Sequence, residues 1–423
     1  MRLRVYQSDK GDCLLVSGKA GGHILVDGGM RKAFQDHVRA DLGKMAANKE
    51  ALDLVYVSHI DQDHISGVLE LLDSVMAWRV YEFRKKQGAN VRAPIPIWAA
   101  RWMVWHTAFS DLLKENAGPV ERLLAQSSLV LGLSSNLKLQ DLALAHHELA
   151  YSVDEAIQVS QRVSATQLKI PLNKQFGGKL IMSRSPAKRE ARIGKMNVFV
   201  IGPLPSEVAR VRDEWNAWLR KNKDRIRKLK KEAEADARSI GNSADRIADL
   251  LAARVDELGN RDDVTAPNLA SVMVLLEEGK TKVLLTGDGH WEDILKGLAH
   301  HKKLDAKGNL HVDVLKIQHH GSEHNHKADM AEHVTADNYV FCGNGKHDNP
   351  DARVVKLVCE SHRKVRPMDK FTLWFNCAPD LAPAGKPRAC MQKVKREVDD
   401  QIAASGGKIS ARYLGKSFFD VTV

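Results

Sequence analysis

The stretch Ser58-His59-Ile60-Asp61-Gln62-Asp63-His64-Ile65-Ser66-Gly67 carries most of the information about the fold and the chemistry of this chain. Four side chains that bind metal ions lie within six positions: His59, Asp61, Asp63 and His64. They follow residues 52–57, an apolar and β-branched run that predicts a buried strand. Carboxylates packed this closely repel one another and lose hydration unless a cation compensates them. The stretch therefore predicts one or two divalent metal ions at the end of a strand.

Three further segments end in side chains of the same kind. An apolar run before Asp288 and another before the pair His319-His320 predict strands that deliver these residues, and Asp27 follows an early hairpin. Loops at strand ends converge at one rim of a sheet, so these side chains are expected to lie close together. A dinuclear site needs about four ligands per ion, with a carboxylate and a water bridging the pair.

These segments resemble the metallo-β-lactamase superfamily, and in particular the soluble hydrolase domain of ComEC-type competence proteins. That branch has an aspartate, here Asp61, where most relatives have the second histidine. The other shared motifs, the last of them imperfect, are Asn268-Leu269-Ala270-Ser271-Val272, Leu285-Thr286-Gly287-Asp288, His319-His320-Gly321-Ser322 and Cys342-Gly343-Asn344-Gly345-Lys346-His347-Asp348-Asn349-Pro350. The match touches residues 1–80, 197–204 and 265–375. It implies an α/β fold, a four-layer αββα sandwich that carries two helical insertions.

The resemblance also implies a set of site residues. It assigns the metal ligands to two ions: His59 and Asp61 to one, Asp63, His64 and His319 to the other, with Asp288 bridging. Asp27 is expected to orient a ligating histidine, since such imidazoles usually donate their other N–H to a carboxylate. His320 would either ligate or contact the scissile phosphate, and His347 is a candidate for contact with the transition state.

One histidine of the superfamily pattern is missing from the sequence. Most members supply it before the Thr-Gly-Asp strand, but the expected position, near Ile201-Gly202-Pro203, has none. His146 and His147 lie in an insertion and are interpreted as surface residues of a helix. The first metal is therefore expected to be weakly held or absent in the resting protein. The oxygen ligand Asp61 shifts the preference from zinc toward manganese, with magnesium as a third option.

The expected reaction is hydrolysis by a metal-activated hydroxide. A divalent metal lowers the pKa of bound water from 15.7 to about 7, which gives hydroxide at neutral pH. Asp63 would orient this hydroxide, and the metals would stabilise the oxyanion that develops. His320 or His347 would assist the leaving group.

The charge of the chain favours an anionic partner. Its formal net charge is +11, and eight of the twelve residues from Arg220 to Lys231 are basic. Such density neutralises phosphates, so these eight side chains are predicted to bind nucleic acid: Arg220, Lys221, Lys223, Arg225, Arg227, Lys228, Lys230 and Lys231. The alternative is a solvated helix face, in which Glu232, Glu234 and Asp236 pair with the cations at helical spacing.

Three functions are compatible with these features. The first is a nuclease that cleaves phosphodiester bonds of DNA or RNA. The second is a hydrolase of a small soluble phosphodiester or another ester, in which the helical insertions form a lid over a compact pocket. The third is a subunit that binds other proteins through its long charged insertion. Retention of all the expected ligands favours a hydrolase.

Changes in composition divide the chain into five parts. Residues 1–80 form the first part of the hydrolase fold, 81–196 a mainly helical insertion that returns to sheet, 197–204 a core strand, 205–264 a charged helical insertion, and 265–423 the second part. Strands are expected at residues 12–16, 22–26, 52–57, 179–183, 197–201, 271–276, 282–286, 312–318, 338–342, 371–375 and 418–423, and helices at 31–49, 68–78 and 351–362. Trp98, Trp102 and Trp105 have helical spacing and are expected in the core.

The cysteines and the apolar runs bear on location. The five cysteines are widely spaced without a CxxC pair, which is typical of a reducing cytosol: Cys13, Cys342, Cys359, Cys377 and Cys390. They are expected to be small buried apolar residues. No run approaches the ~18–20 apolar residues of a membrane helix, and no signal-peptide pattern opens the sequence. A cytoplasmic protein without membrane contact is expected.

Overall fold

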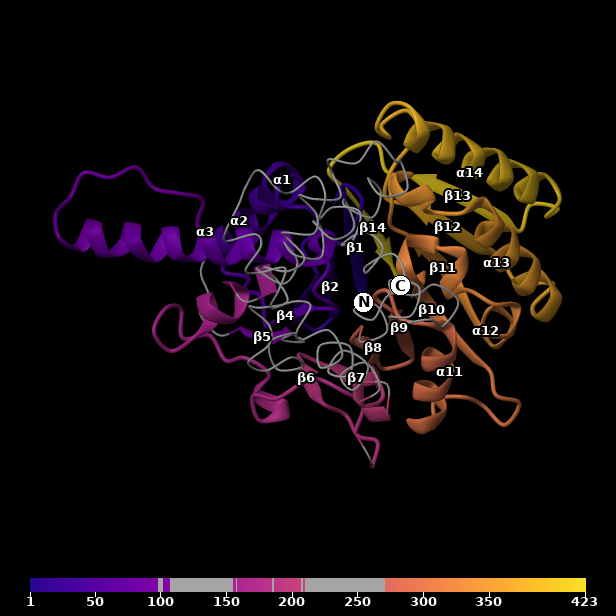
Figure 1. Cartoon of the computed structure of the whole chain (residues 1–423), viewed down its shortest axis with the longest axis horizontal. Helices are drawn as coiled ribbons and strands as arrows, with labels where there is room; N and C mark the ends of the chain where they lie inside the picture. Colours follow the sequence, from indigo (N-terminus) through magenta and orange to yellow (C-terminus); the bar gives the residue numbers. More distant parts are fainter. Residues whose placement is uncertain (98–101, 107–154, 157, 185, 207, 210–270) are drawn as a thin grey trace, which may run out of the picture.

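Two β-sheets face each other in the computed structural model, which describes residues 1–97, 102–106, 155–156, 158–184, 186–206, 208–209 and 271–423. The first sheet has the strand order β14 (Phe418–Thr422), β1 (Arg2–Tyr6), β2 (Leu14–Ser17), β3 (His23–Val26), β4 (Leu54–Val57) and β5 (Met103–His106). The second has the order β13 (Ile409–Tyr413), β12 (Phe371–Phe375), β11 (Val334–Phe341), β10 (Leu310–Lys316), β9 (Thr281–Leu285), β8 (Met273–Glu278), β7 (Met196–Gly202) and β6 (Ala191–Ile193). The termini lie side by side, and the Met1 amino group donates to the Val423 carbonyl at 2.9 Å (Figure 1).

Helices cover the outer faces of the two sheets (Figure 1). Those before β8 are α1 (Arg31–Ala33), η1 (Phe34–Val38), α2 (Arg39–Ala47), α3 (Gln62–Lys86) and η3 (Lys174–Phe176). Those after β8 are α11 (Trp291–His300), η4 (Gln318–Gly321), η5 (Glu323–Asn325), α12 (Ala328–His333), η6 (Lys346–Asp348), α13 (Ala352–Val365) and α14 (Lys386–Ala403). In the described ranges, none of these helices has both the length and the apolar character needed to cross a lipid bilayer.

The alternation of side chains along each strand builds three apolar layers. In β4, Leu54 and Tyr56 point between the two sheets, whereas Val55 and Val57 point toward α2 and α3. In β9, Val283 and Leu285 point between the sheets, and Leu284 points toward the helices of the second half. The layers are therefore helix, sheet, sheet and helix, which is the predicted four-layer arrangement.

The direction of the strands brings the functional loops to one edge. Strand β3 runs parallel to β4 in the first sheet, and β9, β10 and β11 run parallel in the second. Because the carboxyl ends of parallel strands lie at the same edge, the loops after these five strands converge. The loop before β2 joins them, since β2 is antiparallel to β3.

Most of the predicted elements are present with small shifts at their ends. The expected strand 371–375 is β12, and the expected helix 351–362 is α13, which begins after Asp351. The Asp351 side chain accepts a hydrogen bond from the Arg353 amide at 2.7 Å and so caps this helix. Four cysteines are buried as expected, and Cys390 is partly exposed.

Three local predictions are wrong. Residues 103–106 form β5 and not a helix, because pairing with β4 satisfies their backbone groups, although Trp102 and Trp105 are buried as predicted. Residues 179–183 form no strand; Ile181 is buried there without a ladder partner among the described residues. Helix α3 is longer than the predicted helix 68–78. Trp98, His146, His147 and most of the insertion 205–264 lie outside the described residues.

A buried histidine on α13, packed against the second sheet, predicts loss of stability in acid. The Tyr339 hydroxyl lies 2.8 Å from His362 Nδ1, and burial lowers the pKa of His362 to about 4. The unfolded chain has a histidine pKa of about 6.5, so between roughly pH 6.5 and 4 the unfolded state binds more protons. The free energy of unfolding is therefore expected to fall as the pH falls through this window.

The variant His362→Gln keeps a hydrogen-bond acceptor for Tyr339 and removes the titration. The free energy of unfolding is measured with denaturant between pH 7 and pH 4. Its change with pH is expected to be steeper for the wild type than for His362→Gln, by up to about 1.4 kcal/mol per pH unit. The exposed His300→Gln is the control and should keep the wild-type slope. Equal slopes for wild type and His362→Gln would contradict the prediction.

Candidate metal centre

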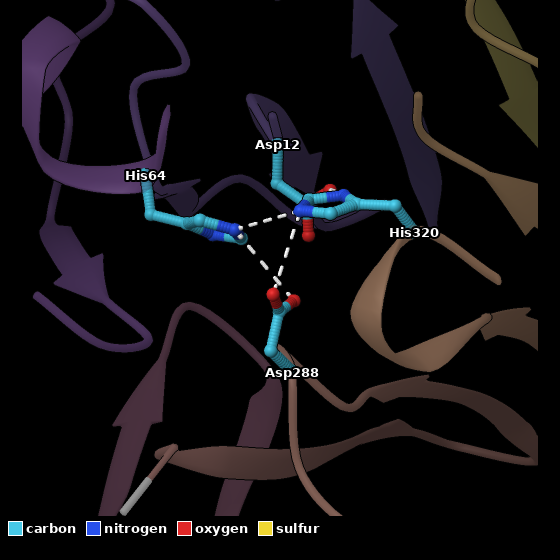
Figure 2. Close-up of side chains that lie close together, drawn as sticks. All are labelled: Asp12, His64, Asp288 and His320. Carbon is cyan, nitrogen blue, oxygen red and sulfur yellow. Dashed lines mark hydrogen bonds and ion pairs between the residues drawn. The ribbon is translucent and has the colours of Figure 1, made fainter. Parts of the chain in front are cut away.

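Four buried side chains from distant parts of the sequence meet at the edge where the strand ends converge. One ligand atom from each of Asp12, His64, Asp288 and His320 lies within 4.8 Å of the others (Figure 2). His64 Nε2 is 3.2 Å from His320 Nε2 and 3.6 Å from Asp288 Oδ1. His320 Nε2 is 3.4 Å from Asp288 Oδ2. The two rings and the Asp288 carboxylate thus point at a common centre.

Three more residues of the sequence motif surround Asp288 and His320. Asp63 Oδ2 lies 3.4 Å from His320 Nε2. His59 Nε2 lies 3.6 Å from Asp288 Oδ2, and His319 Nε2 lies 3.8 Å from the same oxygen. The Asp288 carboxylate is therefore within 3.8 Å of four imidazoles, counting His64, and occupies the middle of the cluster.

Asp61 faces the cluster in place of capping a helix. It stands at the N-cap of α3, where an aspartate side chain usually accepts a hydrogen bond from the helix backbone. No such bond forms among the described residues, and Asp61 Oδ2 lies 3.5 Å from His59 Nε2. A carboxylate that gives up its capping position in this way is available to a ligand.

The outer nitrogen of each motif histidine is held by a side-chain oxygen. His64 Nδ1 lies 2.9 Å from Asp27 Oδ2, and His319 Nδ1 lies 2.6 Å from Asn325 Oδ1. Ser58 Oγ lies 3.0 Å from His59 Nδ1 and donates to Asp27. With Nδ1 fixed, each Nε2 turns toward Asp288, which is the tautomer and orientation that ligating imidazoles require.

The backbone of the paired histidines is strained. His319 has φ 45° and His320 has φ 53°, and Gly321 follows with φ 87°. Non-glycine residues in the left-handed region carry a cost of order 1–3 kcal/mol and persist where the surrounding structure holds them. Here Asn325 contributes, since its Nδ2 donates to the carbonyl of Asp288 at 3.0 Å and its Oδ1 holds His319.

Close glycine contacts fix the start of α3 against the cluster. A Cβ on Gly28 would lie 2.3 Å from the Val68 amide nitrogen, and one on Gly67 would lie 2.0 Å from the Gly28 carbonyl. The chain after β3 therefore passes against the first turns of α3, which positions Asp63 and His64.

The ionisable groups of the cluster stabilise one another's charge. Burial lowers the pKa of His64, but Asp288 and Asp27 raise it, and the net pKa lies well above the ordinary value. Burial also lowers the pKa of His320, but Asp288 and Asp12 raise it, and the net value is about 9. Burial raises the pKa of Asp288, and the adjacent His320 and His64 lower it well below its usual range. The carboxylates therefore favour positive charge at this centre.

The donor set fits a divalent cation. Ligand atoms about 2.1 Å from a tetrahedral ion lie about 3.4 Å from one another, and the contacts of Asp288, His64 and His320 span 3.2–3.6 Å. In the described part of the chain, two buried atoms that face this centre have no hydrogen-bond partner: His59 Nε2 and Asp288 Oδ1. A cation at the centre would interact with these atoms. It would also lie between His64 Nε2 and His320 Nε2, which are 3.2 Å apart, so neither nitrogen would need a proton there.

The structure brings the predicted ligands together and leaves other predicted residues apart. His59, Asp61, Asp63, His64, Asp288 and His319 all lie in or beside the cluster, with Asp27 behind His64. His320 lies inside it. His347 is exposed on η6, and no contact joins it to the cluster among the described residues, so the geometry does not support the predicted transition-state contact. The basic run Arg220–Lys231 lies outside the described residues.

Three residues at the centre were not predicted: Asp12, Lys316 and Asn325. Lys316 lies within the predicted strand 312–318. A lysine inside the apolar sequence Asp313-Val314-Leu315-Lys316-Ile317 is expected to be buried and therefore to need a charged partner. Asp12 stands alone before β2 and carries no such signal. Asn325 lies six residues beyond His319, in a loop that sequence patterns do not place.

Comparison with known proteins agrees with this geometry over part of the chain. The family model of the Metallo-beta-lactamase superfamily matches residues 8–77, which include the loop before β2 and the His59–His64 motif. No curated protein matches the chain. The mixed α/β architecture of two sheets and flanking helices is consistent with the fold of that superfamily. The match and the buried cluster together suggest a metal-dependent hydrolase.

Proposed function

We propose that this protein is a metal-dependent phosphodiesterase that cleaves DNA or RNA. The observation that carries the proposal is the buried Asp–His cluster at the strand ends, in which carboxylates and imidazoles share one centre. The net charge of +11 supports a polyanionic substrate. The resemblance to ComEC-type hydrolase domains supports the same substrate class.

The metal would be held by the cluster residues. Asp63, His64, Asp288 and His320 would hold one ion. His59, Asp61 and His319 would hold a second and weaker one with Asp288. Zinc or manganese suits this mixture of nitrogen and oxygen donors. When bound, a divalent ion neutralises phosphate charge and lowers the pKa of water toward neutrality. The protein's own residues determine how substrate and water are oriented around it.

Asp63 is the carboxylate best placed to handle the attacking water. Its side chain is 15% exposed, compared with 3% for Asp288, so it can reach both solvent and the cluster. Burial raises the pKa of Asp63, but the hydrogen bond from His320 and the charge of His64 lower it well below the usual range. Asp63 is therefore ionised and would orient the water through a hydrogen bond.

A substrate panel tests the proposal. The protein is incubated with single-stranded DNA, duplex DNA, RNA and bis-p-nitrophenyl phosphate, each with Mn²⁺, Mg²⁺ or Zn²⁺ and with a chelator. Cleavage of a polynucleotide is expected with Mn²⁺ or Zn²⁺ and not with the chelator. Asp63→Ala should abolish it, and the exposed Asp329→Asn on α12 should not.

The other outcomes identify the alternatives. Cleavage of the small ester without cleavage of any polynucleotide would indicate a hydrolase of small phosphodiesters. Inertness toward every substrate in every metal would indicate a subunit that binds other proteins through its insertions. Either result would overturn the proposed nuclease activity.

A further inference from the structure

A buried lysine–aspartate pair lies behind the cluster. Asp12 and Lys316 are each about 1% exposed. The Lys316 ammonium contacts Asp12 Oδ2, donates to the Gly287 carbonyl at 3.0 Å, and lies 3.6 Å from Asp288 Oδ1. Burying two charges is costly unless their geometry and hydrogen bonds compensate. The pair lies directly beside Asp288 and His320, which indicates that it has a role in the centre.

The two oxygens of Asp12 have different neighbours. One is bound by Lys316, and the other, Oδ1, lies 3.2 Å from His320 Nδ1 (Figure 2). The opposite nitrogen of the same ring, Nε2, faces His64, Asp63 and Asp288. His320 therefore has the same arrangement as His64 with Asp27 and His319 with Asn325: an oxygen behind Nδ1, and Nε2 toward the centre.

We propose that Asp12 and Lys316 form one positioning unit for His320, and that Asp12 is not itself a metal ligand. A ligand oxygen must face the ion, whereas both Asp12 oxygens are directed at other groups, the ammonium and the outer nitrogen of the ring. Lys316 holds the carboxylate in place, and the carboxylate selects the Nδ1–H form of His320. This inference rests on one part of the proposed function, that the centre faced by His320 binds a metal ion.

The charges support this assignment. A free Asp12 carboxylate would add a further negative charge beside Asp63 and Asp288, but Lys316 neutralises it through direct contact. The ammonium also restricts Asp288, since it lies against Oδ1 while Oδ2 faces His59, His319 and His320. Lys316 thus sets the orientation of the central carboxylate as well.

The pair also connects the two sheets. Asp12 precedes β2 in the first sheet, and Lys316 ends β10 in the second. Ring and carboxylate ligands from both sheets must keep fixed distances to share an ion, and errors of about 0.5 Å matter at such sites. A direct ion pair across the interface, two residues from Leu14 and four from His320, fixes that spacing.

The test uses the full chain with 15N-labelled histidine and the variants Asp12→Asn, Lys316→Met and the double variant. Zinc content after dialysis gives the stoichiometry, competition with a chelator gives the affinity, and NMR reports the Nδ1 proton of His320. Asp12→Asn is expected to keep the wild-type stoichiometry and to bind zinc about 10–100-fold more weakly. Its Nδ1 proton signal is expected to move upfield, because a neutral amide oxygen is a weaker acceptor than a carboxylate. The double variant is expected to lose less affinity than the sum of the two single variants.

Two comparison variants make the result decisive. His64→Gln removes an expected ligand and should lower the zinc stoichiometry, and Lys364→Met removes an exposed ion pair with Glu332 and should change nothing. If Asp12→Asn lost zinc as His64→Gln does, Asp12 would be a ligand and the proposal would be wrong. An unchanged affinity and Nδ1 signal in Asp12→Asn would overturn it as well. The Nδ1 signal is also read without metal or substrate, so failure of the proposed nuclease activity is distinguishable from failure of this inference.

Discussion

Asp288→Asn is expected to abolish turnover and to release the metal from the centre. The Asp288 carboxylate lies within 3.8 Å of His59, His64, His319 and His320, and so connects the ligands of both expected ions. An asparagine at this position has one oxygen in place of two and no charge. Residues that merely orient metal ligands cost about 10–100-fold in affinity or activity when replaced, so the loss at Asp288 is expected to exceed that range.

The measurement has two parts. Hydrolysis of bis-p-nitrophenyl phosphate with saturating Mn²⁺ gives kcat/KM, and elemental analysis of dialysed protein gives the metal content. Both are expected to fall together, because the carboxylate contributes to binding the ion and not only to the transition state. A fall in kcat/KM with unchanged metal content would assign Asp288 a chemical role instead.

Asp313→Asn is the matched control. Asp313 lies on β10 in the same sheet, and its Oδ2 accepts a hydrogen bond from the Lys282 amide at 2.7 Å, a role that an asparagine oxygen can fill. Its kcat/KM and metal content should remain within about threefold of the wild type, a change of at most ~0.7 kcal/mol. Retention of wild-type metal content and turnover in Asp288→Asn would remove the central carboxylate from the proposed site.

The strand ends of the site were predictable because strand pattern and ligand type coincide there. The apolar runs before His59, Asp288 and His319 each fit a buried strand, and each run stops at a side chain that binds metals. Parallel neighbours then place these ends at one edge without further information. The same logic fails for Asp12, which precedes its strand, and for Asn325, whose place is fixed by an irregular loop.

One prediction failed because a local pattern does not determine tertiary contacts. The spacing of Trp102 and Trp105 fits a helix, but residues 103–106 pair with β4, and the backbone hydrogen bonds of the sheet outweigh the helical period. His347 lies within the 342–350 motif, and its transition-state contact stays a prediction. It is exposed, with φ 54°, a local geometry that no periodicity could indicate.

Replacing the eight basic side chains between Arg220 and Lys231 with glutamine is expected to flatten the salt dependence of nucleic-acid binding. Each phosphate contact contributes about −0.9 to the slope of log K against log salt for duplex DNA, and about −0.7 for single strands. Several contacts from this run would therefore change the slope by several units. For proteins with 6–10 phosphate contacts, affinity falls about 10³–10⁵-fold between 50 and 200 mM salt.

The binding measurement needs a protein that does not cut its ligand. Fluorescence anisotropy with a labelled oligonucleotide is carried out in the Asp63→Ala background, over a series of salt concentrations. The control replaces three exposed cations on α14, Lys393, Lys395 and Arg396, with glutamine. If general surface charge were responsible for binding, the two sets would change the slope equally per charge removed.

The competing interpretation makes the opposite prediction. If Glu232, Glu234 and Asp236 neutralise the run at helical spacing, its cations are already paired, and few counterions are released when a polynucleotide binds. The slope would then be unchanged in the glutamine variant, and the run would be a solvated helix face. A flattened slope with unchanged hydrolysis of bis-p-nitrophenyl phosphate would instead assign the run to substrate binding, because a small ester reaches the Asp288 centre without the contacts that hold a polynucleotide.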